Sequence, residues 1–438
     1  MNKLIWVTLA LTIACALPAR SQKIYLSLEK ALESALGSNK ELHLASLDEG
    51  SAQERYRQTN AVLLPQVRVS YTGMSTNNPL NAFGFKLQQQ AITSGDFNPA
   101  MLNAPSSTQN FMTKVEWLQP VLNLEMSSVR QAAKAQQSVY AFLKVRTKEY
   151  IILEVQKAYV QLQMAHEARN VLEETLGTVN AIYTATDSRF QKGYLQKSDL
   201  LQVEIQVRTA ESKLAEANSA IRNASDFLAL LMGTPAGVIY TTDSLSRIPS
   251  NEYIAVTIPE DRADFKAMRS MIEAHEKAIN SGKMSYLPKL NAFGEYIIND
   301  NEAVGFGSNS YLVGAQLSWT LFNGTATRHK ILEQRIERDK TVVQFSLQRE
   351  QAQLELNRTT RQLHDTEFMI HQQQTAVQQS AEALRIVRNR YQQGLVTTSE
   401  VLQAQSLLAQ QKLLLVQSVC QHNTTISYER FLTATFEK

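Results

Sequence analysis

Cysteine, proline and glycine are scarce in this chain. Its 438 residues include 2 cysteines, 10 prolines and 16 glycines. Cys15 lies in an N-terminal segment typical of a removable signal, so the remaining Cys420 cannot form an internal disulfide. Long stretches contain nothing that interrupts a helix. Beyond the N-terminal segment no apolar run reaches the roughly 18 residues of a transmembrane helix, which excludes a helical membrane span.

An excess of charge of either sign is also missing. Lys and Arg total 44 against 41 for Asp and Glu, which argues against nucleic acid as a partner. The chain has no P-loop, no H-E-x-x-H motif and no pair of neighbouring cysteines. We therefore expect no enzyme activity, no cofactor and no metal site.

The N-terminus predicts export. Lys3 precedes the apolar run Leu4–Ala14, and Ala19 and Ser21 supply the small residues that a signal peptidase reads. Residues 1–21 are thus predicted to be a signal peptide cleaved before Gln22. A lipid-anchored Cys15 is the alternative.

The remainder of the chain is a duplication. Three motifs recur in the same order, and the last two pairs lie about 200 residues apart, far longer than a solenoid unit. The matching segments are Leu64-Pro65 with Leu287-Pro288, Val121-Leu122-Asn123 with Leu321-Phe322-Asn323, and Arg189-Phe190-Gln191-Lys192-Gly193 with Arg390-Tyr391-Gln392-Gln393-Gly394. We predict two structural repeats, 22–248 and 249–438, each with a helix, two strands and a long helical hairpin.

The helices are too long for a globular domain. Residues 123–189 and 324–394 each span roughly 65 residues, or about 100 Å of helix. Apolar repeats typical of coiled coils run from Leu356 to Tyr391 in steps of seven and from Leu200 to Leu231 in alternating steps of three and four. Shorter helices are predicted at 28–63 and 195–232. Residues after Ser399 carry two adjacent apolar stripes, which favours a wall of helices over an isolated pair.

Four segments alternate apolar and polar residues, typical of strands of bilayer-crossing length. Four strands cannot close a barrel around water, and open edges cannot face lipid, so several chains must share one barrel. Aromatic residues near the predicted strand ends would form an interfacial girdle, or else the core of a small soluble sheet. They are Tyr71, Trp117, Tyr296 and Trp319.

Taken together, these residues resemble the TolC family of outer-membrane efflux and secretion channels. The resemblance covers nearly the whole mature chain and is carried by the Leu-Pro motifs, the Asn123 and Asn323 segments and the two Arg-aromatic-x-x-Gly turns. It implies a mainly α protein with a transmembrane β-barrel: a homotrimer with a twelve-stranded barrel in the outer membrane of a Gram-negative bacterium, continued by a periplasmic α-helical coiled-coil tunnel. It also implies a passive conduit of a tripartite efflux or type I secretion system, in contact with outer-membrane lipid, a periplasmic adaptor (membrane fusion) protein and an inner-membrane pump.

The resemblance also implies roles for residues near the two turns. The tips that would meet the adaptor are Gly193, Tyr194, Leu195, Gly394, Leu395, Val396 and Thr397. The polar links that would keep the tunnel shut are Ser198, Asp199, Tyr391 and Glu400. Val396 replaces the arginine of the family's lock, and Gln403 replaces one of two constriction carboxylates, so a trimer would present three carboxylates at Glu400.

Local rules give a plainer interpretation of some of these positions. Ser198, Asp199, Ser399 and Glu400 are also typical helix N-caps, and the glycines are typical of a simple hairpin turn. Two other protein classes also remain open. A periplasmic adaptor would have a single helical hairpin flanked by soluble β-domains, and a surface-anchored coiled-coil protein would have a C-terminal anchor.

Overall fold

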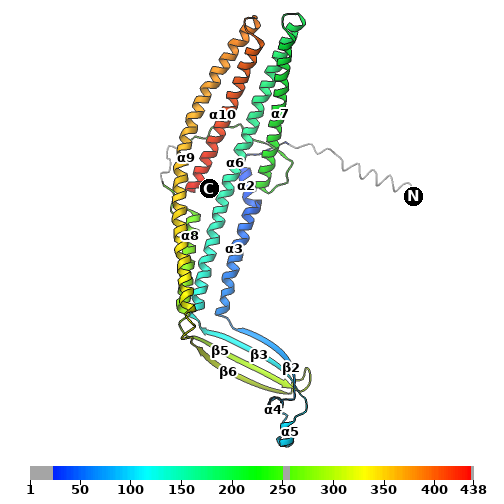
Figure 1. The fold of residues 1–438 in the computed structure, drawn as a ribbon, viewed down its shortest axis with the longest axis vertical. Helices are drawn as coiled ribbons and strands as arrows, with labels where there is room; N and C mark the ends of the chain where they lie inside the picture. Colours follow the sequence, from blue (N-terminus) through cyan, green and yellow to red (C-terminus); the bar gives the residue numbers. More distant parts are fainter. Residues whose placement is uncertain (1–22, 250–256, 436–438) are drawn as a thin grey trace, which may run out of the picture. The chain divides into compact units, whose positions relative to one another are not determined.

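The computed structural model describes residues 23–249 and 257–435, which are mostly helical (Figure 1). The predicted signal peptide and Cys15 lie outside these residues. Within them, no helix is both long enough and apolar enough to cross a membrane.

The duplicated element order is confirmed. Both halves run strand, strand, very long helix, shorter helix. The first set is β2 (Gln66–Thr76), β3 (Thr108–Leu122), α6 (Leu124–Gln191) and α7 (Lys197–Met232). The second set is β5 (Lys289–Asp300), β6 (Ser308–Ser318), α9 (Ala326–Gln392) and α10 (Thr398–Thr433). Helices α6 and α9 contain 68 and 67 residues, as their lack of proline predicted.

The shorter elements differ between the halves. The first half adds β1 (Lys23–Tyr25), α2 (Leu28–Ser38), α3 (Lys40–Gln58) and η1 (Thr59–Val62), then α4 (Pro79–Gln88), η2 (Ser94–Phe97) and α5 (Pro99–Asn103) between its strands. Strand β4 (Ile239–Thr241) and α8 (Ala263–Met284) precede the second set.

The helix predicted over 28–63 is in fact broken at Asn39. The backbone of Asn39 is extended, with φ −66° and ψ 130°. Its side-chain amide donates to the Leu231 carbonyl oxygen at 2.8 Å, and its side-chain oxygen accepts from the backbone of Glu41 and Leu42. The same side chain therefore caps α3 and ties the break to α7, a tertiary contact that overrides local helix propensity.

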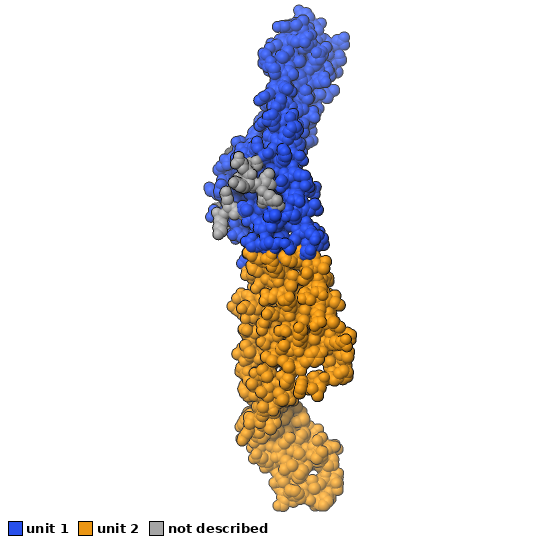
Figure 2. Space-filling model, turned by 90° about the vertical axis from the view of Figure 1, so that its left-hand side faces the viewer, with its two compact units in different colours: residues 1–47, 143–265, 346–438 blue, residues 48–142, 266–345 orange. Residues whose placement is uncertain are grey.

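The described chain divides into two compact units, which Figure 2 colours separately. The first unit contains residues 1–47, 143–265 and 346–438, and the second contains 48–142 and 266–345. Each unit draws segments from both repeats. The repeat boundary at 248/249 stays a prediction.

The first unit is held together by helix seams. Ile151, Val155 and Leu162 of α6 pack with Leu228 of α7 and Ala35 of α2, all buried. On α9 the predicted seven-residue seam is buried at Leu356, Leu363 and Ile370. Small residues in these seams let the helix axes approach closely.

The second unit contains a four-stranded antiparallel sheet in the order β2-β3-β5-β6. Tyr71 lies opposite Thr113, and the duplication-equivalent residues Gly294 and Val313 also lie opposite each other. The two strand pairs therefore share one register. The pairing also puts the apolar members of all four predicted alternations on one face, because directly opposed residues point to the same side.

Candidate functional site

The two helical hairpin turns have the same backbone geometry. Gly193 and Gly394 have φ values of +78° and +76°, where side chains other than glycine are strained. In the first turn the Tyr194 amide donates to the Arg189 carbonyl and the Gly193 amide to Phe190. Leu395 and Gly394 repeat these bonds in the second turn. This is the Schellman pattern, in which a left-handed glycine closes a helix end.

Each turn exposes one large apolar side chain. Tyr194 is 77% exposed and Leu395 is 62% exposed. The neighbouring Gly193, Gly394 and Thr397 are exposed as well, whereas Leu195 and Val396 are half-buried. Val396 packs against a small apolar core, which is consistent with an apolar residue replacing an arginine at this position.

The expected N-caps were assigned to the wrong residues. The caps are Gln196 for α7 and Thr397 for α10, and Asp199 and Glu400 close the capping boxes three residues later. The Glu400 carboxylate accepts a hydrogen bond from the Thr397 hydroxyl at 2.9 Å, and the Asp199 carboxylate accepts one from the backbone N–H of Gln196 at 3.2 Å. The cap is the last residue with extended backbone before each helix, and in both hairpins that residue precedes the serine and carboxylate expected to be caps.

Tyr391 lies in a polar contact between the two hairpins. It is 4% exposed, and its hydroxyl oxygen lies 3.0 Å from that of Thr186 on α6 and 3.2 Å from that of Thr398 on α10. Its hydroxyl bonds neither to Ser198, whose own hydroxyl donates to Gln196, nor to Asp199. Within one chain, the predicted gate residues are thus not brought into one cluster.

Arg189 joins the hairpins, and we had not expected this role for it. Its guanidinium donates to the carbonyl oxygens of Tyr391 at 2.8 Å and of Gln392 at 3.0 Å, the last residues of α9. It also lies over the Tyr391 ring, 4.5 Å from the centroid. A cation at a helix C-terminus satisfies carbonyls that have no partner in the helix. The Arg-aromatic motif was visible in the sequence, but the partner helix was not.

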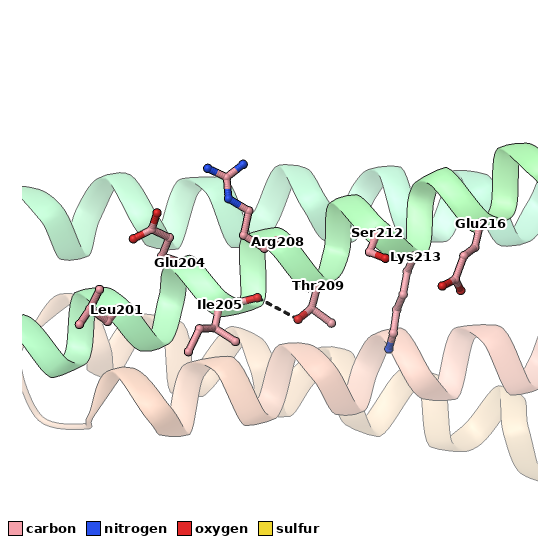
Figure 3. A pocket seen from close by; sticks show the side chains of 8 residues that line it. All are labelled: Leu201, Glu204, Ile205, Arg208, Thr209, Ser212, Lys213 and Glu216. Carbon is pink, nitrogen blue, oxygen red and sulfur yellow. Dashed lines mark hydrogen bonds between the residues drawn. The ribbon is translucent and has the colours of Figure 1, made fainter.

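A shallow groove of about 740 Å³ runs along one face of α7, shown in Figure 3. Leu201 and Ile205 are its apolar residues, and both are exposed. Its charged residues are of both signs, with two cations between two carboxylates along the helix. They are Glu204, Arg208, Lys213 and Glu216. The groove lies on the side of α7 opposite its buried seam at Val203 and Ala210, so α7 has a second face suited to another helix.

The predicted girdle aromatics share the apolar face of the sheet but not one level along it. Tyr71 and Tyr296 lie in the middle of β2 and β5, not near strand ends as expected, and Trp319 follows directly after β6. Trp117 lies opposite Val67 and Gly294. All four rings are substantially exposed in the single chain.

The opposite face of the sheet is polar and charged. Lys114 lies 2.7 Å from a Glu116 carboxylate oxygen and 2.9 Å from one of Glu295. At the loop end, the buried Asn110 and Asn299 side chains are hydrogen-bonded at 2.9 Å. In the segment between β2 and β3, Lys86 pairs with Asp96 at 2.5 Å, and this hydrogen bond lowers the pKa of Asp96 to about 2.

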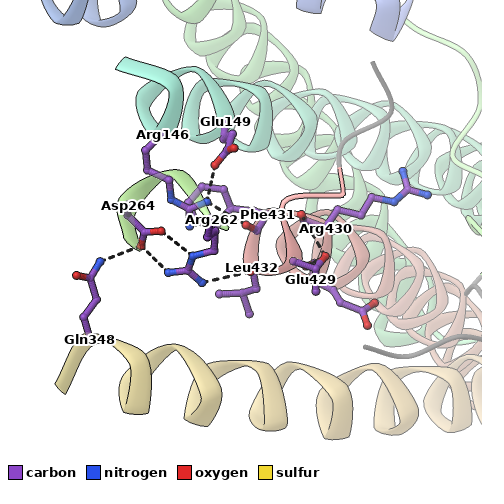
Figure 4. Close-up of polar contacts among 10 residues, drawn as sticks. Arg146, Glu149, Arg262, Asp264, Gln348, Glu429, Arg430, Phe431 and Leu432 are labelled. Carbon is purple, nitrogen blue, oxygen red and sulfur yellow. Dashed lines mark hydrogen bonds and ion pairs between the residues drawn. The ribbon is translucent and has the colours of Figure 1, made fainter. Parts of the chain in front are cut away.

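Two arginines hold the end of α10, as Figure 4 shows. Arg262, which is 5% exposed, donates to both Asp264 carboxylate oxygens and to the Leu432 carbonyl. Arg146 donates to the Phe431 carbonyl and lies over the ring of the same residue. Burial alone would raise the pKa of Asp264, but the hydrogen bonds and charge of Arg262 outweigh it and lower the pKa. The contacts tie α6, α8 and α10 together.

Comparison with known proteins identifies the family. The model of the outer membrane efflux protein family matches residues 31–234 and 257–425. The chain belongs to the outer membrane efflux protein family. The toluene efflux pump outer membrane protein TtgC of Pseudomonas putida is 22% identical over 400 residues, covering 89% of this chain and 79% of the relative. The cation efflux system protein CusC of Escherichia coli is 22% identical over 392 residues, covering 88% and 81%.

Solved structures agree in fold. A crystal structure of CusC superimposes with a TM-score of 0.79 at 17% identity, covering 95% of this chain and 94% of the other. The predicted fold, the outer-membrane location and the efflux-channel interpretation are confirmed, and the adaptor and surface-protein alternatives are not supported. The matched outer membrane efflux proteins are channels, not enzymes.

Proposed function

We propose that this outer membrane efflux protein works as a homotrimer, a passive exit duct joined to a periplasmic adaptor and an inner-membrane pump. The observation that carries the proposal is the open sheet. Among the described residues, β2 and β6 each pair with one neighbour only, so both outer edges are unpaired. Backbone groups on an open edge cannot face lipid, whereas a sheet closed across several chains has no edge.

The charge pattern of the sheet supports a water-filled interior. One face presents Val67, Val69, Tyr311 and Val313 to the outside, all well exposed in a single chain. The other carries the Lys114 ion pairs. Apolar residues on the lipid side and polar residues on the inner side are the pattern of a membrane channel.

The duplication predicts how neighbouring chains pair. Within the chain, β3 and β5 join the two halves, with Glu116 opposite Glu295. The same pairing between β6 of one copy and β2 of the next would place Gln316 opposite Thr72, because these are the duplication-equivalent positions. Both are on the polar face, next to Asn291 and Met112 respectively.

Cysteine cross-linking tests this closure. Opposed residues of antiparallel strands have Cα atoms about 4.5–5.5 Å apart, within the range of a disulfide. The Gln316→Cys, Thr72→Cys double variant should give linked dimers and trimers on non-reducing gels. The control moves one cysteine by a single residue, in the Gln316→Cys, Gly73→Cys variant, so that the two point to opposite faces. Monomers only from the first variant, or equal linking in both, would contradict the proposed ring.

The gate and tip assignments belong to the same proposal. The exposed Tyr194 and Leu395 provide an apolar contact for an adaptor at each hairpin tip. Three copies of Glu400 would form a carboxylate ring, and Asp199 and Tyr391 would link neighbouring helices. The Arg189 contact with α9 supplies a link between hairpins in place of the arginine absent at Val396.

A further inference from the structure

A second cleft, of about 390 Å³, lies in the unit that contains the sheet. It is formed where α8 ends, β5 begins, β6 ends and α9 begins. Its volume is within the range of about 300–1,000 Å³ usual for small-molecule sites. Nothing in the efflux mechanism described above uses it.

The cleft carries more positive than negative charge. Lys289 and Lys330 line it together with Glu125, whose carboxylate pairs with the Lys289 ammonium at 2.6 Å. Lys330 is exposed and forms no hydrogen bond or ion pair with residues 23–249 or 257–435. One ammonium group in the cleft therefore lacks an anionic partner, and an anionic ligand would supply it.

The duplication provides an internal comparison for Lys330. Its counterpart in the first half is Arg130, which donates to the Asn60 side chain at 3.2 Å and lies over the Tyr56 ring. In the second half Lys283 stands at the position of Asn60, so an acceptor has been replaced by another exposed cation. The first site supplies its arginine with an acceptor, whereas the second has a lysine in place of that acceptor.

An apolar rim borders these cations. Leu321 lines the cleft and is 75% exposed, the adjoining Phe322 is 79% exposed, and Trp319 donates its indole N–H to the Tyr286 carbonyl at 2.8 Å. Trp319 and Leu321 continue the alternation of the apolar sheet face beyond the last residue of β6. Apolar side chains beside a cationic cleft suit a molecule with a charged head and an apolar tail.

We propose that this cleft binds one glycerophospholipid per chain, with the phosphate on Lys330 and an acyl chain along Leu321 and Phe322. The inference rests on the proposed membrane orientation of the sheet, which puts the strand–helix junction at the boundary between lipid and water. Lipid is the occupant rather than a soluble anion because the rim is apolar and continuous with the lipid-facing side of the sheet.

Native mass spectrometry of the full-length protein in detergent, titrated with phosphatidylglycerol, tests the site. We expect one tightly held lipid per chain and about tenfold weaker binding for Lys330→Gln, the loss of one charge-assisted hydrogen bond. The matched control is Lys340→Gln, which removes an exposed lysine of the same helix that pairs with Glu337 and should bind as the wild type does. Phe322→Ser should weaken lipid binding several-fold without affecting the charge.

Three outcomes would overturn the assignment: equal binding by the wild type and Lys330→Gln, equal weakening by Lys340→Gln, or displacement of the lipid by millimolar inorganic phosphate. The last would show a soluble-anion site. The same spectra count the chains in each particle. If the protein is a monomer and Lys330→Gln still weakens lipid binding, the trimeric channel is refuted but the lipid site is supported. The two proposals can therefore be tested independently.

Discussion

The contact of Arg189 with the end of α9 should hold the two hairpins of one chain together. Arg189→Met keeps an unbranched side chain but removes both hydrogen bonds to the Tyr391 and Gln392 carbonyls and the cation over the Tyr391 ring. If channel opening separates the hairpin ends, this variant should open more readily, because the contact stabilises only the closed arrangement.

The size of the effect follows from the contacts. Hydrogen bonds from a charged donor contribute about 1.5–3 kcal/mol, and an exposed cation over an aromatic ring about 0.5–1 kcal/mol. Both acceptor carbonyls lie at a helix end that is partly exposed to water, which weakens the two hydrogen bonds. We therefore expect Arg189→Met to remove about 2–3 kcal/mol of stabilisation of the closed arrangement, less than the sum of the separate contributions. That corresponds to a shift of roughly 30- to 150-fold in the equilibrium between closed and separated hairpins.

Planar-bilayer recordings of the purified protein measure this shift as open probability. Arg189→Lys should fall between the wild type and Arg189→Met, since an ammonium cannot span two carbonyls as a guanidinium does. The control is Lys192→Met, which removes an exposed cation that has no hydrogen bond or ion pair among the described residues. Equal open probabilities for wild type and Arg189→Met, or an equal rise with Lys192→Met, would refute the reasoning.

Three further outcomes are expected. Glu400→Gln preserves the capping box but removes the proposed carboxylate ring, so cation selectivity in a salt gradient should fall; unchanged reversal potentials would remove Glu400 from the gate. Arg262→Ala leaves the Asp264 carboxylate buried without its cation and should destabilise the protein by about 3–5 kcal/mol, seen as a lower melting temperature in detergent; an unchanged value would contradict the structural role given to this ion pair. Burial lowers the pKa of His422 below its usual 6.5, so only the unfolded chain gains this proton just below pH 6.5 and stability should fall there. His422→Gln should reduce the fall of melting temperature with decreasing pH below pH 6.5. An unaltered slope would show that His422 does not cause this fall.

Much of the architecture was predictable because it is periodic. The seven-residue seam through Leu356, Leu363 and Ile370 predicted a helix of 67 residues to within a few residues at each end. Alternation through Val67, Val69 and the equivalent strand residues predicted which face of the sheet is apolar. Such patterns are visible locally since each residue's side is determined by its own helix or strand geometry.

Errors occurred at helix ends, where a residue's role depends on a distant segment or on the position of a turn. Asn39 breaks the first helix because its side chain reaches the Leu231 carbonyl, a partner that no local pattern indicates. The caps of α7 and α10 lie two residues earlier than expected, since the position of the turn sets which residue is the last extended one.

The duplication, the long helices, the four alternating strands and the two glycine turns followed from the sequence by itself, because each depends on neighbours along the chain. Only the tertiary structure decided that Arg189 caps α9, that Tyr391 contacts Thr186 rather than Asp199, and that Lys330 lacks the partner its counterpart Arg130 has. The physical reason is that a hydrogen bond or an ion pair needs two groups within about 3–4 Å, and for residues tens to hundreds of positions apart only the folded chain sets that distance.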